Sequence, residues 1–492
     1  MVGTGQTDGV PALSGGAETM IDLGTARESP DVEPSQPLTW RRLRPVALTL
    51  AAALLLTTGG SGPPPAPALV RVAALPYRPS IQLFDHQGFL LTEDLLLTAT
   101  HDPTRVDWLV GAYEPERGRA LWTYRLPGGL ENTPTMRHRA GLVLLTGARV
   151  DGTPGMRTVA LDALSGAERW SLPHQVQTVS DADLALAVDD VYPADAAISE
   201  DSVPDGGDVY LAPWGQRYGT PPSGVLVAGI TLSSGTVRWR SGLVASAATD
   251  AGSRFGDRGP SAADPQAGLL AVLTTGAVEL WDPRTGAVRH RFPAALPDTY
   301  PQLDRDLLLV QHTEDEVTAY STVDYRRLWA APVAQNGAFG LCTATGLICD
   351  MPPTEQWVVD RATGARLWQI RKQHQLVAAP GQLLEVVPVD WVDARPVRTV
   401  DPFTGESRID LADWRTVTSG RDGAFLLTTG KVASGPTWFG LLGPEAAAPV
   451  PLGRVPVGVG GCQLSTTVIA CNTARDGLHV WRYRAGLRRL DE

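Results

Sequence analysis

Reactive side chains and catalytic motifs are scarce in this sequence. Its 492 residues include only four cysteines, no two of them adjacent, and eight scattered histidines. There is no His-Glu-x-x-His pair, no Gly-x-Ser-x-Gly turn and no Gly-rich phosphate loop ending in Gly-Lys. These absences argue against a zinc protease, an α/β-hydrolase and a P-loop nucleotidase. We expect the histidines to be polar surface or packing residues rather than ligands of a metal.

Lysine is also nearly missing, since only Lys372 and Lys431 contribute to the 42 basic residues. Such strong preference for arginine is typical of a GC-rich, bacterial genome. The formal net charge is −11, and a protein this acidic is a poor general binder of nucleic acid.

A repeated phrase is the most informative feature that is present. Residues 160–170, 230–239 and 358–368 each read as an apolar strand, a Ser/Thr-Gly turn and a second strand that ends on Trp. This pattern predicts a β-hairpin. Weaker copies can be aligned on the turn positions, which are residues 118, 166, 235, 286, 325, 364, 405 and 443.

The spacing of these turns is typical of one propeller blade. Most intervals are between 38 and 51 residues, and two further short apolar runs lie between successive phrases. Each unit therefore has about four strands, and a ring of such sheets buries both faces of every sheet. The fold class predicted is all-β, a propeller. The recurrent tryptophans are expected to pack between neighbouring blades; they are Trp122, Trp170, Trp239, Trp329 and Trp368.

The phrases at Asp162–Gly166 and Asp360–Gly364 resemble the PQQ-like, quinoprotein-type β-propeller repeat, whose signature is Asp-Ala-x-Thr-Gly-x-x-x-Trp. The resemblance extends from about Ser80 to Arg489 and implies eight blades, although nine candidate units leave seven to nine open. One unit would then be split, with Leu69 to Tyr77 completing the last blade. Enzymes of this family hold their quinone against a disulfide between adjacent cysteines, and no Cys-Cys pair exists here. We therefore expect no cofactor and no catalytic residues.

The first 76 residues differ from the repeats. Residues 1–44 are polar, without apolar periodicity, and are expected to be a disordered cytoplasmic tail. Residues 45–61 are uncharged and follow three arginines, which predicts a transmembrane signal anchor with everything after it exported. A Pro/Ala-rich linker, 62–76, then leads to the propeller at 77–492. A cleaved signal peptide ending near Ala66-Pro67-Ala68 is one alternative, because about 17 residues is short for a span. A core helix is another.

The four cysteines form two local pairs. Cys342 and Cys349 flank one turn, and Cys462 and Cys471 flank another, with apolar residues in both arms. Local pairing is the simplest connectivity, so we predict two hairpin disulfides. Their spacings are wider than those of zinc sites, and we expect no metal.

One interval departs from the repeat. The units at Gly166 and Gly235 are 69 residues apart, and the excess falls in an acidic stretch from Asp181 to Pro222. Insertions in repeat proteins map to loops on one face, often the binding face. Its candidate partner-binding residues are Asp189, Asp190, Tyr210, Trp214 and Tyr218. A solvated loop with its aromatics folded inward, or a Ca²⁺ site, are the alternatives.

Three functions follow from these features. The first is a non-catalytic, membrane-anchored, extracytoplasmic binding or scaffold module whose partner is another cell-envelope protein. The second is a quinone-dependent oxidoreductase, which the missing adjacent cysteines disfavour. The third is a sensor that reads a ligand outside the cell and signals through the tail.

Overall fold

A computed structural model provides the structure of the chain. It describes residues 69–75, 88–102, 104, 107–127, 134–149, 155–178, 183–193, 197–198, 210–211, 217–220, 222–242, 244, 261–264, 268–274, 276–293, 301–304, 306–313, 316–332, 338–342, 347–351, 356–379, 382–388, 394–420, 423–429, 435–444, 446–473 and 477–483. The chain divides into two units, Met1–Ala66 and Pro67–Glu492, and all described residues belong to the second.

The described residues form strands and turns without an α-helix, arranged as nine four-stranded sheets and one small three-stranded sheet. Seven of the larger sheets use four strands that are consecutive in the chain. Their strands are β2 (Phe89–Leu91), β3 (Leu96–Asp102), β4 (Asp107–Tyr113) and β5 (Ala120–Pro127); β6 (Thr135–Arg139), β7 (Leu142–Ala148), β8 (Met156–Asp162) and β9 (Glu168–Leu172); β17 (Ser261–Asp264), β18 (Leu269–Thr274), β19 (Ala277–Trp281) and β20 (Val288–Pro293); β21 (Gln302–Asp304), β22 (Leu307–Thr313), β23 (Glu316–Ser321) and β24 (Arg327–Pro332); β25 (Ala338–Cys342), β26 (Leu347–Met351), β27 (Gln356–Asp360) and β28 (Arg366–Ile370); β29 (Gln375–Ala379), β30 (Gln382–Pro388), β31 (Ala394–Val400) and β32 (Ser407–Asp410); and β33 (Thr416–Ser419), β34 (Phe425–Thr428), β35 (Thr437–Leu442) and β36 (Val450–Val455).

The other two larger sheets interrupt this order. One has an insertion between its second and third strands and consists of β10 (Gln175–Thr178), β11 (Leu184–Val191), β15 (Gly224–Thr231) and β16 (Val237–Arg240). The insertion contains the three-stranded sheet of β12 (Ala197–Ile198), β13 (Tyr210–Leu211) and β14 (Arg217–Tyr218). The last sheet joins the two ends of the described chain and consists of β37 (Val459–Leu464), β38 (Val468–Thr473), β39 (Gly477–Tyr483) and β1 (Leu69–Leu75).

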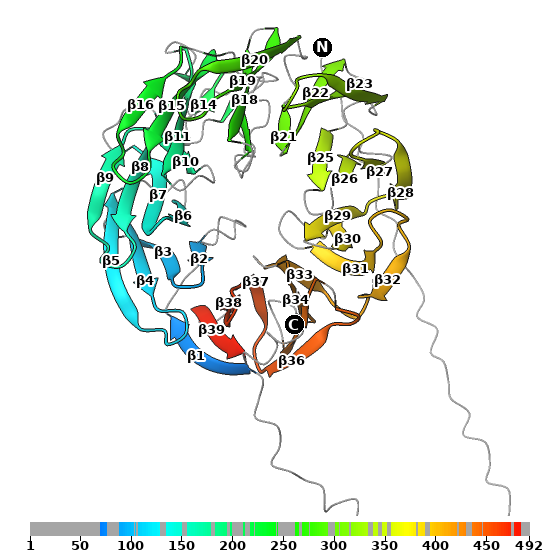
Figure 1. The fold of residues 1–492 in the computed structure, drawn as a ribbon. Coiled ribbons are helices and arrows are strands. Elements are labelled where there is room, and N and C mark those ends of the chain that lie inside the picture. The colour runs from blue at the N-terminus through cyan, green and yellow to red at the C-terminus, as the bar shows by residue number, and fades with distance from the viewer. Residues whose placement is uncertain are drawn as a thin grey trace, which may run out of the picture. The chain divides into compact units, whose positions relative to one another are not determined.

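The nine sheets follow one another around a ring, so the fold is a β-propeller (Figure 1). The first strands of neighbouring sheets contact each other, as β2 does with β6 and β21 with β25, and they form the inner edge. The ring closes where β2 contacts β37. Each pair of neighbouring sheets buries an apolar layer between them; Val110 and Trp122 of one sheet, for example, cluster with Val143 and Leu161 of the next.

The prediction that Leu69 to Tyr77 completes the last unit is confirmed. Strand β1 pairs antiparallel with β39, with Leu69 opposite Tyr483 and Leu75 opposite Leu478. Residues 69–75 are therefore a strand of the ring rather than part of a linker, and the ring begins before the predicted boundary at residue 77. The last unit is therefore split between the two ends of the described chain, as predicted, but the described residues form nine four-stranded sheets where eight blades were expected.

The predicted tail at residues 1–44 and the predicted anchor at 45–61 lie outside the described residues. Within the part of the chain that the structure does describe, there is no helix long and apolar enough to cross a membrane.

Candidate interaction site at an inserted sheet

The five recurrent tryptophans each join one sheet to the next. Every indole Nε1 donates a hydrogen bond of 2.8–2.9 Å to a backbone carbonyl in the turn of the following sheet, three residues before its turn glycine. The pairs are Trp122 with Ala163, Trp170 with Leu232, Trp239 with Pro283, Trp329 with Arg361 and Trp368 with Pro402. The tryptophans therefore hold the ring together and are packing residues.

The turn glycines are needed for two reasons. Gly166 has a φ of 71°, which side chains rarely adopt. A Cβ at this position would also lie 2.6 Å from the Cδ2 atom of Trp122 in the preceding sheet. The Ser/Thr-Gly turn and the Trp of the repeated phrase are thus complementary parts of a contact between neighbouring units.

At one junction between neighbouring sheets, both the tryptophan and the turn glycine are replaced by other residues. His290 stands where the fourth strand would carry Trp, and Tyr325 stands where the next turn would carry Gly. Their rings stack with centroids 4.3 Å apart and planes 4° from parallel. Tyr325 has a φ of 60°, the conformation of the glycine it replaces.

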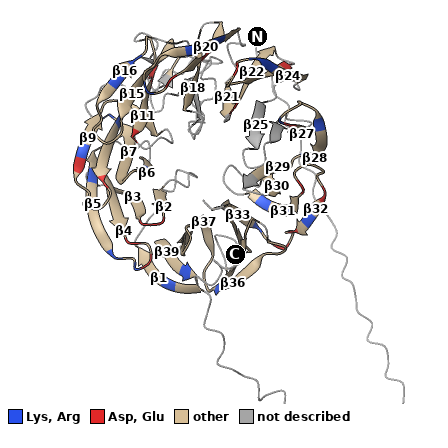
Figure 2. Ribbon diagram, in the orientation of Figure 1, with Lys and Arg blue, Asp and Glu red and all other residues tan. Residues whose placement is uncertain are grey.

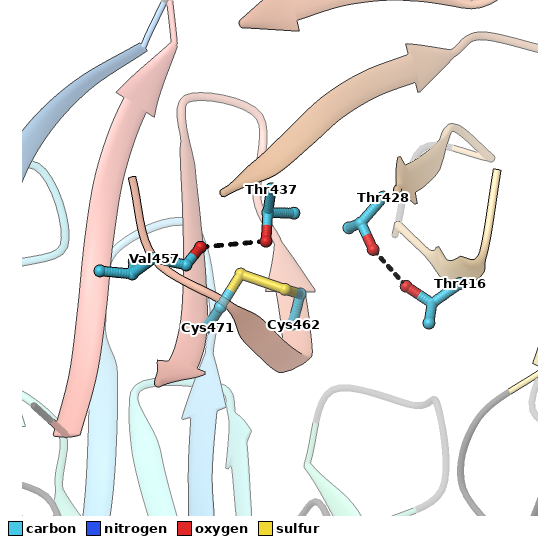
Figure 3. The surroundings of a disulfide bond; sticks show 6 residues. All are labelled: Thr416, Thr428, Thr437, Val457, Cys462 and Cys471. Carbon is cyan, nitrogen blue, oxygen red and sulfur yellow. Dashed lines mark hydrogen bonds between the residues drawn. A yellow bond between two sulfur atoms is a disulfide. The ribbon is translucent and has the colours of Figure 1, made fainter. Parts of the chain in front are cut away.

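The predicted disulfide between Cys462 and Cys471 is present and joins β37 to β38 (Figure 3). It lies near the hydrogen bond of 3.0 Å from Thr437 Oγ1 to the Val457 carbonyl. The disulfide therefore cross-links two neighbouring strands of the sheet that closes the ring. Cys342 and Cys349 belong to the adjacent strands β25 and β26, but their side chains lie outside the described residues, so the second disulfide stays a prediction.

The acidic stretch from Asp181 to Pro222 is only partly a loop. Its first half contains β11, so Asp189 and Asp190 lie in a strand of the ring, opposite Leu226 and Val225 of β15. The small sheet follows, with β14 in its middle. The inserted sheet thus leaves the ring at the end of β11, directly after the two acids.

Only one predicted aromatic of the insertion has a described side chain, and it is buried. Tyr218 is 4% exposed and stacks on Tyr192, with ring centroids 4.1 Å apart. Its ring faces the fold, so the prediction that Tyr218 offers a ring to a partner is corrected: it anchors the small sheet instead. The side chains of Tyr210 and Trp214 lie outside the described residues.

Asp189 and Asp190 have different surroundings. Asp189 Oδ2 accepts a hydrogen bond from the His174 ring, and the His174 carbonyl accepts one of 2.8 Å from Thr158 of the preceding sheet. Asp190 Oδ1 is enclosed, and the described residues give it no hydrogen-bond partner. Burial, with the negative charge of Asp189 beside it, raises the pKa of Asp190 to about 6. A carboxylate whose ionisation destabilises the folded protein therefore lies at the base of the inserted sheet.

We expect Asp190→Asn to stabilise the protein at neutral pH. The raised pKa means that ionisation opposes folding, a cost that is absent below about pH 4, grows as the pH rises through 6 and is complete above it. Asparagine removes this cost, which from the shift is about 3 kcal/mol. Thermal unfolding from pH 4 to 8 should show parent and variant diverging as the pH rises, whereas the exposed-site control Asp413→Asn should follow the parent. Parallel curves for Asp190→Asn would contradict the assignment.

Two buried carboxylates with ionic partners, Glu279 and Glu385, were not recognised in the sequence. Glu279 accepts hydrogen bonds from the Trp281 indole and from Arg291. Glu385, only 1% exposed, is bonded by His374 and Arg398. The available signal was one charged residue inside an apolar strand, as in Leu383-Leu384-Glu385-Val386. Both clusters are internally neutralised, so we treat them as structural.

Within the described ranges, no three His, Cys, Asp or Glu side chains are grouped so that they could hold a metal ion. The outer strands carry basic and acidic residues side by side, so charge does not single out one part of the rim (Figure 2). The inserted sheet, with the acids at its base, remains the feature that distinguishes one sheet from the other eight.

Comparison with known proteins gives a family. The family described as "Outer membrane protein assembly factor BamB" matches residues 87–330 and 222–398, which together exceed half of the chain. No curated protein matches the sequence.

Several solved structures are similar at low identity. BamB from Moraxella catarrhalis is 13% identical, covering 84% of this chain and 100% of its own, with a TM-score of 0.40. A quinohemoprotein alcohol dehydrogenase from Comamonas testosteroni is 10% identical, covering 85% and 78%, with a TM-score of 0.40. A eukaryotic initiation factor is 10% identical, covering 78% and 98%, with a TM-score of 0.49. At these scores the likenesses carry no argument about activity.

Proposed function

Because this chain belongs to the BamB-like family of PQQ-type β-propellers, we propose that it is a non-catalytic binding module that docks another protein of the cell envelope. The ring is held outside the membrane by residues 45–61, and residues 1–44 stay in the cytoplasm. The arginines that precede the apolar segment support this orientation. The disulfide between Cys462 and Cys471 is compatible with an oxidising compartment.

The observation that carries the proposal is the inserted sheet. In eight of the nine sheets, the described residues between the second and third strands form no further strand. In the ninth sheet, β11 and β15 are separated by β12, β13 and β14. Insertions that depart from a repeat are common sites of binding in repeat proteins. The rigid junctions of the ring hold the base of this sheet in place. We therefore place the partner on the inserted sheet.

The test compares tagged full-length protein with a variant in which residues 194–221 are replaced by a short Gly-Ser turn. The pairing of β11 with β15 does not use the removed residues, so the ring should remain intact. Cross-linking in native membranes, followed by affinity purification, should recover a stoichiometric envelope protein with the parent and at least tenfold less with the variant. Full recovery with the variant, or no stoichiometric partner with the parent, would count against the proposal.

The enzyme hypothesis has its own test. The proposed function predicts no turnover when the full-length protein, supplied with quinone and Ca²⁺, is assayed for dye-linked oxidation of alcohols and glucose. A commercial quinoprotein dehydrogenase serves as the positive control. Sustained oxidation that depends on the quinone would replace the binding module with an oxidoreductase.

A further inference from the structure

The chain enters and leaves the ring at the same end. We call this the turn end: it carries the turns between the third and fourth strands of each sheet, such as Asp162–Gly166. Strand β39 is the third strand of its sheet, so its last residue, Tyr483, lies at the turn end. Leu69, the first residue of β1, pairs with Tyr483 and lies there too. Residue 69, where the described chain begins, therefore lies at the turn end.

Three turns at this end expose an apolar side chain at their tips. Leu164 is 87% exposed, Val323 is 77% exposed and Phe403 is 59% exposed. All three occupy the same position, two residues before the turn glycine or, in one sheet, before Tyr325. They are the most exposed large apolar side chains among the described residues.

The three tips are held in fixed conformations. The Phe403 amide donates 2.9 Å to Asp401 Oδ1, and the Val323 amide donates 3.2 Å to Ser321 Oγ. Next to Leu164, the Ser165 amide donates 2.9 Å to Asp162 Oδ1. These side chains project from ordered turns and find no apolar neighbour to cover them in the ring.

The tips belong to three separate sheets, β6–β9, β21–β24 and β29–β32, which lie at different places around the ring (Figure 1). A protein partner would need one contiguous patch. A planar surface, by contrast, can touch separate projections from one end of a ring at the same time. This arrangement favours a lipid bilayer over a globular partner.

The charges at the same turns are largely compensated within each turn. Arg117 and Arg326 have side chains 74% and 73% exposed and pair with Glu114 and Asp324 of their own turns. The carboxylates of two tip-bearing turns are occupied by arginines, Asp162 by Arg169 and Asp401 by Arg408. The Arg169 guanidinium and the Ser165 hydrogen bonds lower the pKa of Asp162, so its negative charge stays compensated across the physiological pH range.

The length of the segment between the predicted anchor and β1 is consistent with contact between the turn end and the bilayer. Seven residues, 62–68, separate the predicted anchor from β1. A fully extended chain spans about 3.3–3.6 Å per residue, so these residues reach about 25 Å at most. A ring tethered by so short a segment at its turn end stays close to the bilayer.

We propose that the turn end rests on the membrane, with Leu164, Val323 and Phe403 entering the headgroup region. The inference rests on the proposed function for the anchor that brings the ring to the bilayer. It adds an orientation, because the connection between β11 and β15 that carries the inserted sheet leaves the ring from the opposite end and faces away from the lipid.

The test places an environment-sensitive fluorophore at single introduced cysteines in the full-length chain, reconstituted in vesicles of phosphatidylcholine and phosphatidylglycerol. Leu164→Cys, Val323→Cys and Phe403→Cys report the tips. Pro332→Cys is the matched control, since Pro332 is exposed at the other end of the sheet that carries Val323. We expect spin-labelled lipid to quench the three tip labels at least threefold more than the control. The parent chain, treated with the same dye, measures labelling of the native cysteines.

The outcomes separate the two proposals. Equal quenching at the tips and at residue 332, in protein that floats with the vesicles, would overturn the orientation and leave the anchor standing. Failure of the parent chain to float with vesicles would overturn the anchor and, with it, the proposed function. Each labelled variant should unfold at the temperature of the parent, because the substituted side chains are exposed.

Discussion

Trp170→Ala is expected to lower the free energy of unfolding by about 3–5 kcal/mol, the usual cost of truncating a large buried aromatic side chain. Trp170 is 8% exposed and packs in the cluster between β7–β9 and β11–β15. Its indole also donates 2.8 Å to the Leu232 carbonyl of the next sheet. Truncation therefore removes both the apolar contact and the hydrogen bond across one junction of the ring. Urea denaturation of the full-length chain measures the loss.

Trp438 provides the matched control, since its side chain is 51% exposed. We expect Trp438→Ala to cost less than about 1 kcal/mol, as surface substitutions do. Hydrogen exchange should locate the damage of Trp170→Ala in β9 and β16, on the two sides of the affected junction. Similar losses for the two alanine variants would mean that the tryptophan between the sheets does not stabilise the ring.

The contact can also be tested from its other side. Gly235 has a φ of 68°, and a Cβ there would lie 2.8 Å from the Trp170 ring. Gly235→Ala should thus be destabilising in the parent, and less so after Trp170→Ala, because only the backbone strain remains.

The repeated phrase was predictable because its signals are local. The turn of Asp360–Gly364 needs a glycine with positive φ and an Asp side chain that caps the turn amides. The tryptophan follows four residues later. Each of these requirements restricts one position of the phrase to a particular residue type, and the positions have a fixed spacing. The strands, the turns and the propeller class could therefore be predicted from a single sequence.

The number of sheets depends on contacts that leave no such pattern. The completion of the last sheet by Leu69–Leu75, some 400 residues before its partner β39, was predicted from the candidate units, but their number was not. The junction of His290 with Tyr325 keeps the contact while changing both residues, so it no longer matches the phrase. Substitutions that compensate each other become visible only when the chain is folded.

The sequence predicted where the insertion lies in the chain, but not how its residues are arranged. Asp189 and Asp190 were expected in a partner-binding loop, yet they lie in β11, paired with β15, and Asp190 Oδ1 is enclosed. The excess length of the insertion located the site. The burial of Asp190 and Tyr218 is not revealed by composition.

Arg398→Met is expected to have the second large effect, a loss of about 3–5 kcal/mol, because it leaves a buried carboxylate without its cation. Glu385 is 1% exposed, and its two oxygens are held by His374, at 2.6 Å, and by Arg398. Methionine fills the space of the arginine stem but cannot compensate the charge. The change is measured by urea denaturation at pH 7.

The same sheet offers an exposed pair as the control. Arg408, half exposed on β32, binds Asp401 of the adjoining turn. We expect Arg408→Met to cost less than about 1 kcal/mol, because solvent replaces most of the interaction. Two arginine-to-methionine changes in one sheet thus differ mainly in the burial of the partner carboxylate.

A second substitution identifies the cause of the loss. In the double variant Glu385→Gln/Arg398→Met the buried charge is gone, while the glutamine can still hydrogen-bond His374. This variant should recover most of the stability lost in Arg398→Met, since the unpaired charge rather than the missing contact carries the cost. If the double variant is no more stable than Arg398→Met, the arginine stabilises the sheet through packing, and the charge of Glu385 is not what requires it.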